Sequence, residues 1–249
     1  GEAGVDQSVT GTALADTLSA SYDAGVDASV SLNMTGIETF DVALGDDAVE
    51  MVFDMTKVTG LTQINLTDTS NESVEFNELI AGVTVDATTT DTTNTVVEVK
   101  LATVSGTETQ AFNVSAATAD DNLKLVVADV ETVTIKPESA EQVDLDLSAL
   151  SMTTAGEVMT VTFSGTNDVE VTTLNADVTT LDASGMGTGG AVVQTGRSAT
   201  AASTYTGSAG ADTFIMMNTS DVLTAGAGSD TLDIDYQGIL GGLNIDLNA

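Results

Sequence analysis

Two aspartates near the C-terminal end of the sequence stand eighteen residues apart in nearly the same local context. Asp212 lies in the run Gly-Ala-Asp-Thr-Phe, and Asp230 lies in the run Gly-Ser-Asp-Thr-Leu. Asp221 stands halfway between them, so the stretch has a period of nine, with an apolar residue two positions after each aspartate. Carboxylates are hard oxygen ligands, and carboxylates at a fixed spacing are suited to binding a hard cation.

A period of nine residues is typical of a parallel β-roll, in which a tight loop and a short strand make each half of a coil. Residues eighteen apart then lie on the same side of adjacent coils, so Asp212 and Asp230 would be stacked about 4.8 Å apart. Two carboxylates at this distance repel each other unless a cation lies between them. Glycines in the loops would let carbonyl oxygens point inward, and carbonyl and carboxylate oxygens together form the usual ligand shell of Ca²⁺.

We therefore predict a Ca²⁺ site in this stretch, formed by carboxylates and loop carbonyl oxygens. Its expected ligands are Asp212, Asp230, Gly207, Ala209, Gly226 and Gly228. Two further candidates are Asp221, whose block lacks the glycines, and Asp16, which lies in a degenerate copy at residues 11–19. The alternative interpretation is that these loops are ordinary glycine turns, whose aspartates accept backbone N–H groups.

The composition is strongly acidic. The chain has 249 residues with 38 Asp and Glu against 5 Lys and Arg, no His and no Cys, and a formal net charge of −33. Such a chain repels nucleic acid and anionic lipid as well as itself, and salt or divalent cations would relieve this repulsion. The lack of His removes the usual general base, and the lack of Cys excludes disulfides.

No apolar run approaches the roughly 20 residues of a membrane span, so we expect none. The first residues do not form a signal peptide and are expected to be the interior of a longer polypeptide.

The segments that must position these residues show the sequence patterns of β-strands. Short alternating runs rich in Val and Thr, such as residues 96–101 and 158–163, are separated by Gly, Asn, Asp and Ser. A unit at residues 36–44 recurs at residues 129–137, about 92 residues later, and such repeats usually stack. We predict an all-β fold, a right-handed parallel β-solenoid (β-helix or β-roll) of stacked repeats, with a tandem β-sandwich as the alternative. Short helical turns are expected near residues 77–80 and 147–152.

Each repeat unit also carries an apolar-Asp motif, with copies at Asp54, Asp146 and Asp182. These aspartates are expected to be turn or cap residues that accept backbone N–H groups. Glu38 and Glu131 are expected to be the outward members of alternating strands. The Thr-rich run at residues 88–95 is irregular and is expected to be a loop.

The nonapeptide blocks resemble the RTX calcium-binding repeat of haemolysin-type bacterial proteins, G-G-x-G-x-D-x-U-x. Two positions depart from that pattern, because Ser208 replaces the second glycine and Ala225 replaces the first. Together with the Val/Thr repeats upstream, the stretch is similar to the repetitive regions of bacterial S-layer proteins and large RTX adhesins. This resemblance implies an extracellular structural protein, exported by a type I system, whose folding and lattice assembly need calcium.

We accordingly expect three segments: a degenerate N-terminal cap at residues 1–35, a Val/Thr-rich repeat domain at 36–196 and an RTX-like calcium β-roll at 197–249. The expected function is structural and not enzymatic, at the bacterial cell surface, with self-association into a lattice or fibre and a cell-surface polysaccharide as partners. One alternative is a segment of a secreted adhesin that binds a glycan or a surface such as ice. A second is a β-helix enzyme acting on polysaccharides.

Overall fold

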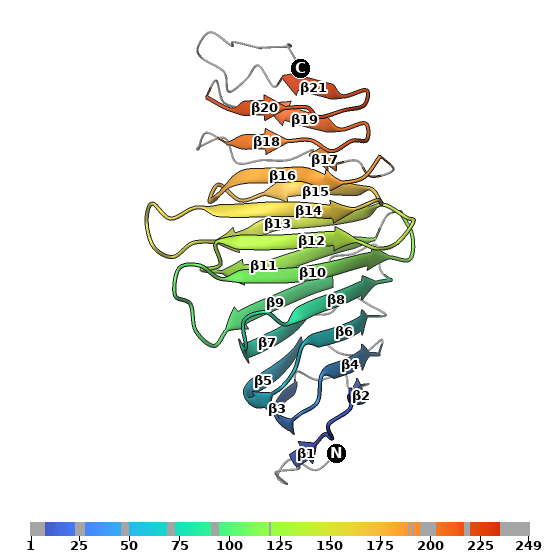
Figure 1. Ribbon diagram of the computed structural model, residues 1–249, viewed down its shortest axis with the longest axis vertical. Helices are drawn as coiled ribbons and strands as arrows, with labels where there is room; N and C mark the ends of the chain where they lie inside the picture. Colours follow the sequence, from blue (N-terminus) through green and yellow to red (C-terminus); the bar gives the residue numbers. More distant parts are fainter. Residues whose placement is uncertain are drawn as a thin grey trace.

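The computed structural model describes residues 8–22, 28–45, 50–68, 73–90, 95–119, 121–188, 190, 192–194, 203–216 and 220–234. These residues form two parallel sheets and contain no helix (Figure 1). Consecutive strands alternate between an 11-stranded sheet of odd-numbered strands and a 10-stranded sheet of even-numbered strands. We call these the odd sheet and the even sheet. Two successive strands with their loops therefore make one coil.

The strands of the odd sheet are β1 (Ser8–Thr10), β3 (Ala28–Thr35), β5 (Glu50–Thr59), β7 (Ser73–Leu79), β9 (Thr95–Leu101), β11 (Asn122–Ala128), β13 (Val143–Ser151), β15 (Val169–Leu174), β17 (Val192–Gln194), β19 (Thr213–Met216) and β21 (Thr231–Ile234). Those of the even sheet are β2 (Thr17–Tyr22), β4 (Thr39–Leu44), β6 (Gln63–Asp68), β8 (Thr84–Thr89), β10 (Thr109–Ala116), β12 (Thr132–Pro137), β14 (Met159–Gly165), β16 (Val178–Met186), β18 (Thr204–Thr206) and β20 (Val222–Thr224).

Alternating sequence patterns place one apolar row of each strand between the two sheets. In β12, for example, Val133 and Ile135 are buried while Thr132 and Thr134 face outward. Branching at Cβ suits Val, Ile and Thr to such a pleated surface. Because each coil buries the apolar row of its neighbours, the core is one continuous column, mostly of Val and Leu, with aromatic rings and methionines among them.

The predicted all-β parallel β-solenoid is confirmed, and the alternative of a tandem β-sandwich is wrong. Every strand pair among the described residues is parallel, whereas sandwiches are built from antiparallel hairpins and Greek keys. The two sheets continue across residues 35–36 and 196–197, where β3 pairs with β5 and β16 with β18. The distinct roles of the three expected segments remain a prediction.

The helical turns expected near residues 77–80 and 147–152 are wrong. Residues 77–79 belong to β7 and residues 147–151 to β13. Both places contain a register irregularity that breaks strict alternation, and Glu78 has a positive φ of 60°. A bulged strand therefore produced the sequence pattern that suggested a helical turn.

The apolar-Asp motifs form bulges inside strands rather than turns. Asp146 Oδ1 accepts the Ser148 N–H at 2.9 Å, and Asp182 Oδ1 accepts the Ser184 N–H at the same distance. Asp54 Oδ1 accepts the Thr56 N–H at 3.0 Å. The register shifts beside all three aspartates. The carboxylates thus accept backbone N–H groups as expected, and each holds an extra residue in its strand.

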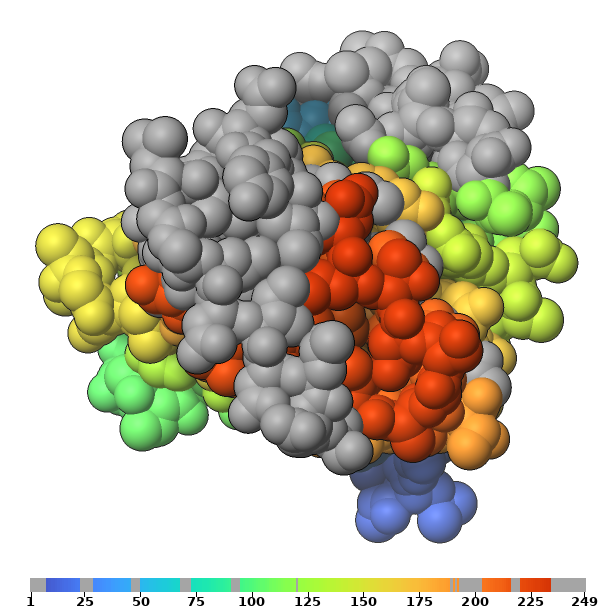
Figure 2. All heavy atoms as spheres, turned by 90° about the horizontal axis from the view of Figure 1, so that it is seen from above, coloured from blue at the N-terminus to red at the C-terminus, as the bar shows by residue number. Residues whose placement is uncertain are grey.

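Figure 2 looks along the stack of coils. The loops that follow β9 and β13, green and yellow in that view, project sideways from the two-sheet body. Among the described residues, no helix is long and apolar enough to cross a membrane.

Four aromatic rings strengthen the N-terminal half of the core. The Phe53 ring lies 5.3 Å from Tyr22, 5.6 Å from Phe40 and 5.5 Å from Phe76, measured between ring centroids. These rings come from β2, β4, β5 and β7, so they connect both sheets over successive coils. Edge-to-face and stacked pairs add stability beyond the burial of their area.

We predict that Phe53→Ala lowers the free energy of unfolding by about 3–5 kcal/mol, because it leaves a cavity among three aromatic rings. Urea titration followed by circular dichroism measures this loss. Val126→Ala on the outward side of β11 is the control and should change stability by less than about 1 kcal/mol. Equal losses in both variants would contradict the assignment of this core.

Candidate functional site with stacked carboxylates

Acidic side chains at the corners of the coils accept backbone N–H groups from the coil before them. Glu38 Oε2 accepts the Asp16 N–H at 2.8 Å, and Glu131 Oε2 accepts the Glu108 N–H at 2.9 Å. Both glutamates precede a strand and are not its outward members, so that expectation is wrong. We call this series of contacts the corner ladder. Its other members are Asp177, Asp212, Asp221 and Asp230, which accept from Met152, Val192, Ser203 and Asp212 respectively.

Asp212 is the most enclosed of the predicted ligands. Its side chain is 1% exposed, and its Oδ1 accepts the Val192 N–H at 2.8 Å while its Oδ2 accepts the Ser208 N–H at 2.7 Å. Gly207 lies directly against it, because a Cβ added there would be 2.7 Å from Asp212 Oδ2. The local sequence therefore folds into a loop that holds the carboxylate against backbone amides.

Asp230 lies one coil beyond Asp212, as the eighteen-residue spacing predicts. The strands that follow them pair with Thr213 opposite Thr231. Asp230 Oδ1 accepts the Asp212 N–H at 3.1 Å. The two aspartates are therefore stacked as expected, and a backbone amide lies between them and reduces their mutual repulsion.

Two glycines of the last described loop are required by close packing between coils. A Cβ added at Gly226 would lie 2.1 Å from the Ser208 carbonyl oxygen. At Gly228 the corresponding distance to the Gly210 carbonyl oxygen is 1.8 Å. Both glycines also have positive φ, which disfavours other residues. Carbonyl oxygens of one loop thus point at the glycines of the next, and Ala209 belongs to the same loop as Ser208 and Gly210.

The structure separates the two further candidates from this pair. Asp221 precedes β20 in the even sheet, whereas Asp212 and Asp230 precede strands of the odd sheet. Its Oδ1 accepts the Ser203 N–H at 2.9 Å. Asp16 immediately precedes β2, which lies at the N-terminal end of the stack (Figure 1), and it accepts the Thr12 N–H. In both the N-terminal copy and the C-terminal loop, the aspartate thus accepts the N–H of the residue four positions before it.

Oxygen atoms gather in the C-terminal loop around a serine hydroxyl. The Ser208 hydroxyl oxygen lies 2.8 Å from the Gly190 carbonyl oxygen and 3.0 Å from both carboxylate oxygens of Asp212. The Ser208 hydroxyl therefore occupies the point on which these acceptor oxygens converge. In the part of the chain that the structure describes, no three acidic side chains are grouped to hold a metal. Asp212, Asp230 and loop carbonyls are the residues that would hold an ion here.

Other stacked carboxylates lie on the outer face of the odd sheet, and sequence reasoning missed them. Glu75 pairs in register with Glu98, and the Lys100 ammonium contacts both at 2.9 and 3.0 Å. These contacts raise the pKa of Lys100, chiefly through the hydrogen bond to Glu75. One cation thus holds two neighbouring coils. The parallel register was needed to find this site, because the three residues lie on two strands.

A glutamine bridges a second stacked pair. Asp144 pairs with Glu170 in the next coil. The Gln142 side-chain amide donates to Asp144 Oδ1 at 3.3 Å and to Glu170 Oε2 at 2.9 Å. A neutral donor therefore suffices where no lysine is available.

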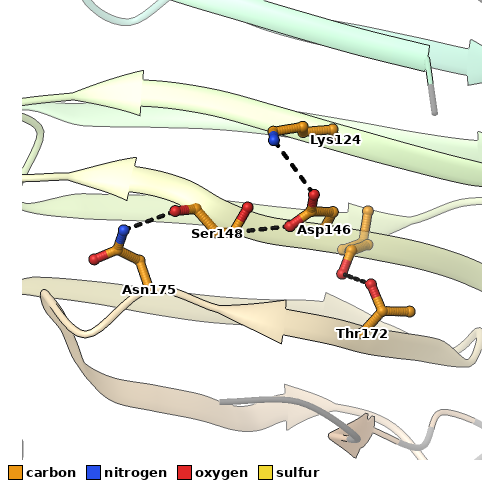
Figure 3. A network of polar contacts seen from close by, with 6 residues as sticks. Lys124, Asp146, Ser148, Thr172 and Asn175 are labelled. Carbon is orange, nitrogen blue, oxygen red and sulfur yellow. Dashed lines mark hydrogen bonds and ion pairs between the residues drawn. The ribbon is translucent and has the colours of Figure 1, made fainter. Parts of the chain in front are cut away.

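The network around Asp146 joins three coils (Figure 3). The Lys124 ammonium lies 3.5 Å from Asp146 Oδ2, while Asp146 Oδ1 holds the Ser148 N–H. The Asn175 side chain donates to the Ser148 carbonyl oxygen at 2.7 Å. The bulge at Asp146 is thus fixed from both neighbouring coils.

On the outer face of the even sheet, acidic and amide side chains alternate along one column of paired residues. The column contains Ser19, Asp41, Asn65, Asp86, Asn113 and Lys136. Asn65 donates to Asp41 Oδ1 at 2.7 Å. Burial raises the pKa of Asp86, and the charge of Glu138 adds to this, while Asn113 opposes it. Alternation keeps two carboxylates from facing each other directly.

Comparison with family models, with curated proteins and with solved structures finds no match for this chain. The fold and the corner ladder define its class, a parallel β-solenoid whose acidic corners are stabilised by backbone amides.

Glu108 donates its N–H to the corner ladder, and its own carboxylate is held by N–H groups of its own loop. Its carboxylate accepts from the Ser105 hydroxyl and from the backbone N–H groups of Ser105, Gly106 and Thr107. These bonds, first among them the Ser105 hydroxyl, lower the pKa of Glu108 from 4.5 to about 2. Because folding lowers this pKa, the stabilising contribution is present above pH 4.5 and is lost as the pH falls toward 2.

We predict that Ser105→Ala raises the pKa of Glu108 toward its ordinary value, because the strongest donor is removed. An NMR titration of the side-chain carboxyl carbon measures the change. Val104→Ala alters an exposed neighbour in the same loop and should leave the Glu108 pKa where it is. A Glu108 pKa near 4.5 in the wild type would show that these bonds do not form in solution.

Proposed function

We propose that this chain is a structural building block of an extracellular assembly, such as a bacterial surface layer, in which calcium promotes folding and self-association. The proposed role is not enzymatic. The observation that carries the proposal is the continuous stack, in which two sheets of 11 and 10 strands run unbroken through a chain of net charge −33. Such a stack is a rigid spacer whose stability depends on neutralising its own carboxylates.

The C-terminal loops are the place where we propose that calcium binds. Asp212 and Asp230 occupy adjacent coils, and carbonyl oxygens of the loop before Asp212 point at glycines of the loop before Asp230. Backbone amides stabilise these carboxylates but carry no net charge, so they leave the net charge of the chain unchanged. A divalent cation would lower that charge, and binding to a site absent from the unfolded chain contributes free energy to folding.

The proposed partners are further copies of this chain and a cell-surface polysaccharide. In a calcium-poor cytoplasm, repulsion among carboxylates would keep the chain loose, which suits export through a type I system. Outside the cell, calcium would favour the folded stack and reduce repulsion between acidic surfaces of neighbouring subunits. The segment of a secreted adhesin is the second candidate, and the surface described in the next subsection favours it.

We predict that calcium titration from chelator to about 1 mM, the range of extracellular calcium modules, produces a cooperative gain of β structure followed by growth in particle size. Circular dichroism and light scattering measure the two steps, with magnesium as the ion control. A flat response at low salt would overturn the calcium half of the proposal. If the chain folds fully with calcium but the particles do not grow, the proposed role as a building block of an assembly is wrong.

The variant Asp212→Asn tests whether calcium acts at the C-terminal loops. It keeps the size of the side chain but removes one charge from the stacked pair, so the calcium midpoint should rise several-fold. Asp233→Asn removes the same charge from an exposed position in β21 and should leave the midpoint unchanged. Identical midpoints in the two variants would place the calcium site elsewhere.

A further inference from the structure

The outer face of the even sheet carries a two-dimensional array of threonines. In one column of paired residues, successive strands contribute Thr109, Thr132, Thr160, Thr180 and Thr204. Two positions further along the same strands, the second column contains Ala111, Thr134, Thr162, Asp182, Thr206 and Thr224. We call the two columns together the threonine face.

The threonine side chains point away from the core. The residue between the two columns is buried in each strand, as with Val133 in β12, Val161 in β14 and Tyr205 in β18. Thr109 and Thr204 are exposed, and the threonines of β12 and β14 are partly covered by their neighbours in the same columns. The threonine face is therefore a solvent-facing surface of the sheet.

This face carries almost no charge, although the chain is strongly acidic. Strands β10 to β20 of the even sheet contain two charged residues, Lys136 and Asp182. The odd sheet on the opposite side carries the bridged acidic pairs and both Lys100 and Lys124. Charges usually cover a surface that serves only to keep a protein in solution, so their scarcity here points to a contact surface.

The geometry of the sheet gives this array a regular lattice. Strands of adjacent coils lie about 4.8 Å apart, and alternate residues along a strand lie about 6.6 Å apart. Branching at Cβ restricts χ1 of threonine, so hydroxyl and methyl groups repeat with the coils. Strands β10 to β16 lie nearly parallel in Figure 1, whereas β2 to β8 run obliquely. The array therefore occupies the part of the sheet with little twist.

We propose that the threonine face binds ice. Its hydroxyl and methyl groups repeat about 4.8 Å apart between coils and about 6.6 Å apart along a strand, on the scale of the distances between water oxygens on a crystal face of ice. Water ordered by the array then already has the arrangement of the crystal surface. The contact area extends over six strands, so many weak contacts add up to a stable attachment.

A crystalline polysaccharide is a less suitable ligand for this surface. Sugar rings stack on exposed aromatic side chains, whose faces are broad and apolar. The aromatic residues of the even-sheet strands from β10 to β20, which are Phe112, Phe163 and Tyr205, are all buried in the core. Apart from Asp182, the two columns offer hydroxyl and methyl groups, which suit an ordered layer of water.

The Thr-rich run at residues 88–95 is not part of this surface. Thr89 and Thr95 are buried, and their hydroxyl groups lie 3.1 Å from each other. Thr89 ends β8 and Thr95 begins β9, and residues 91–94 lie outside the described residues. The regular array comes instead from isolated threonines that the register brings together.

The wild-type chain is expected to cause thermal hysteresis and to inhibit ice recrystallisation. Thr134→Lys places a charge between the uncharged residues Ala111 and Thr162 of the array. It should lower the activity by at least about tenfold, because the ammonium would have to lose its hydration at the ice surface. Thr173→Lys on the outer face of the odd sheet is the matched control. Thr173 is exposed and pairs with Asp146, so this variant should fold and keep full activity.

A gain-of-function variant keeps the test independent of folding defects. Ala111 pairs with Thr84 on one side and Thr134 on the other. Ala111→Thr should therefore lengthen the second column and increase hysteresis about twofold or less, in proportion to the added contacts.

Three results would overturn the proposal: no ice activity in the wild type, equal losses in the two lysine variants, or binding to crystalline cellulose or chitin in place of ice. The assay requires no calcium-driven assembly, so its failure would leave the proposed structural role intact.

Discussion

The stacking of coils about 4.8 Å apart is the constraint on which this structure depends. It brings each side chain next to the equivalent side chain of the following coil, so favourable and unfavourable contacts both repeat along the stack. This repetition stabilises the fold through its apolar side chains, because each inward row buries the next. The same repetition is destabilising for carboxylates, because like charges at that distance repel each other. With a net charge of −33, the chain must separate its acidic groups wherever they meet.

The chain separates them in three ways. At the corners, a backbone N–H lies between successive acidic residues, as between Asp212 and Asp230. On the odd sheet, Lys100 or Gln142 bridges two carboxylates of adjacent coils. On the even sheet, asparagine alternates with aspartate, as at Asn65 and Asp41. In each case a donor occupies the place where two negative charges would otherwise face each other.

These arrangements give the two outer faces different chemistry. The odd sheet collects the charged pairs, so screening by salt weakens interactions mainly there and at the corners. The even sheet, from β10 onward, is left with threonines in register and little charge. A rigid body with one charged face and one regular neutral face can associate through the first and bind a repeating surface through the second. The two proposed roles, structural and adhesive, are therefore compatible in one molecule.

The sequence by itself determined the fold class and the stacking of Asp212 over Asp230, because strand alternation and an eighteen-residue period are local patterns. It also indicated that Asp54, Asp146 and Asp182 hold backbone N–H groups, but it misplaced them in turns, since a bulge and a turn have similar local sequences.

Only the tertiary structure decided which distant residues share a column. Coils of unequal length bring Thr132 beside Thr160 and Glu75 beside Glu98, at spacings of 28 and 23 residues. Register depends on the length of every loop and on every bulge, and neither is encoded in a fixed period.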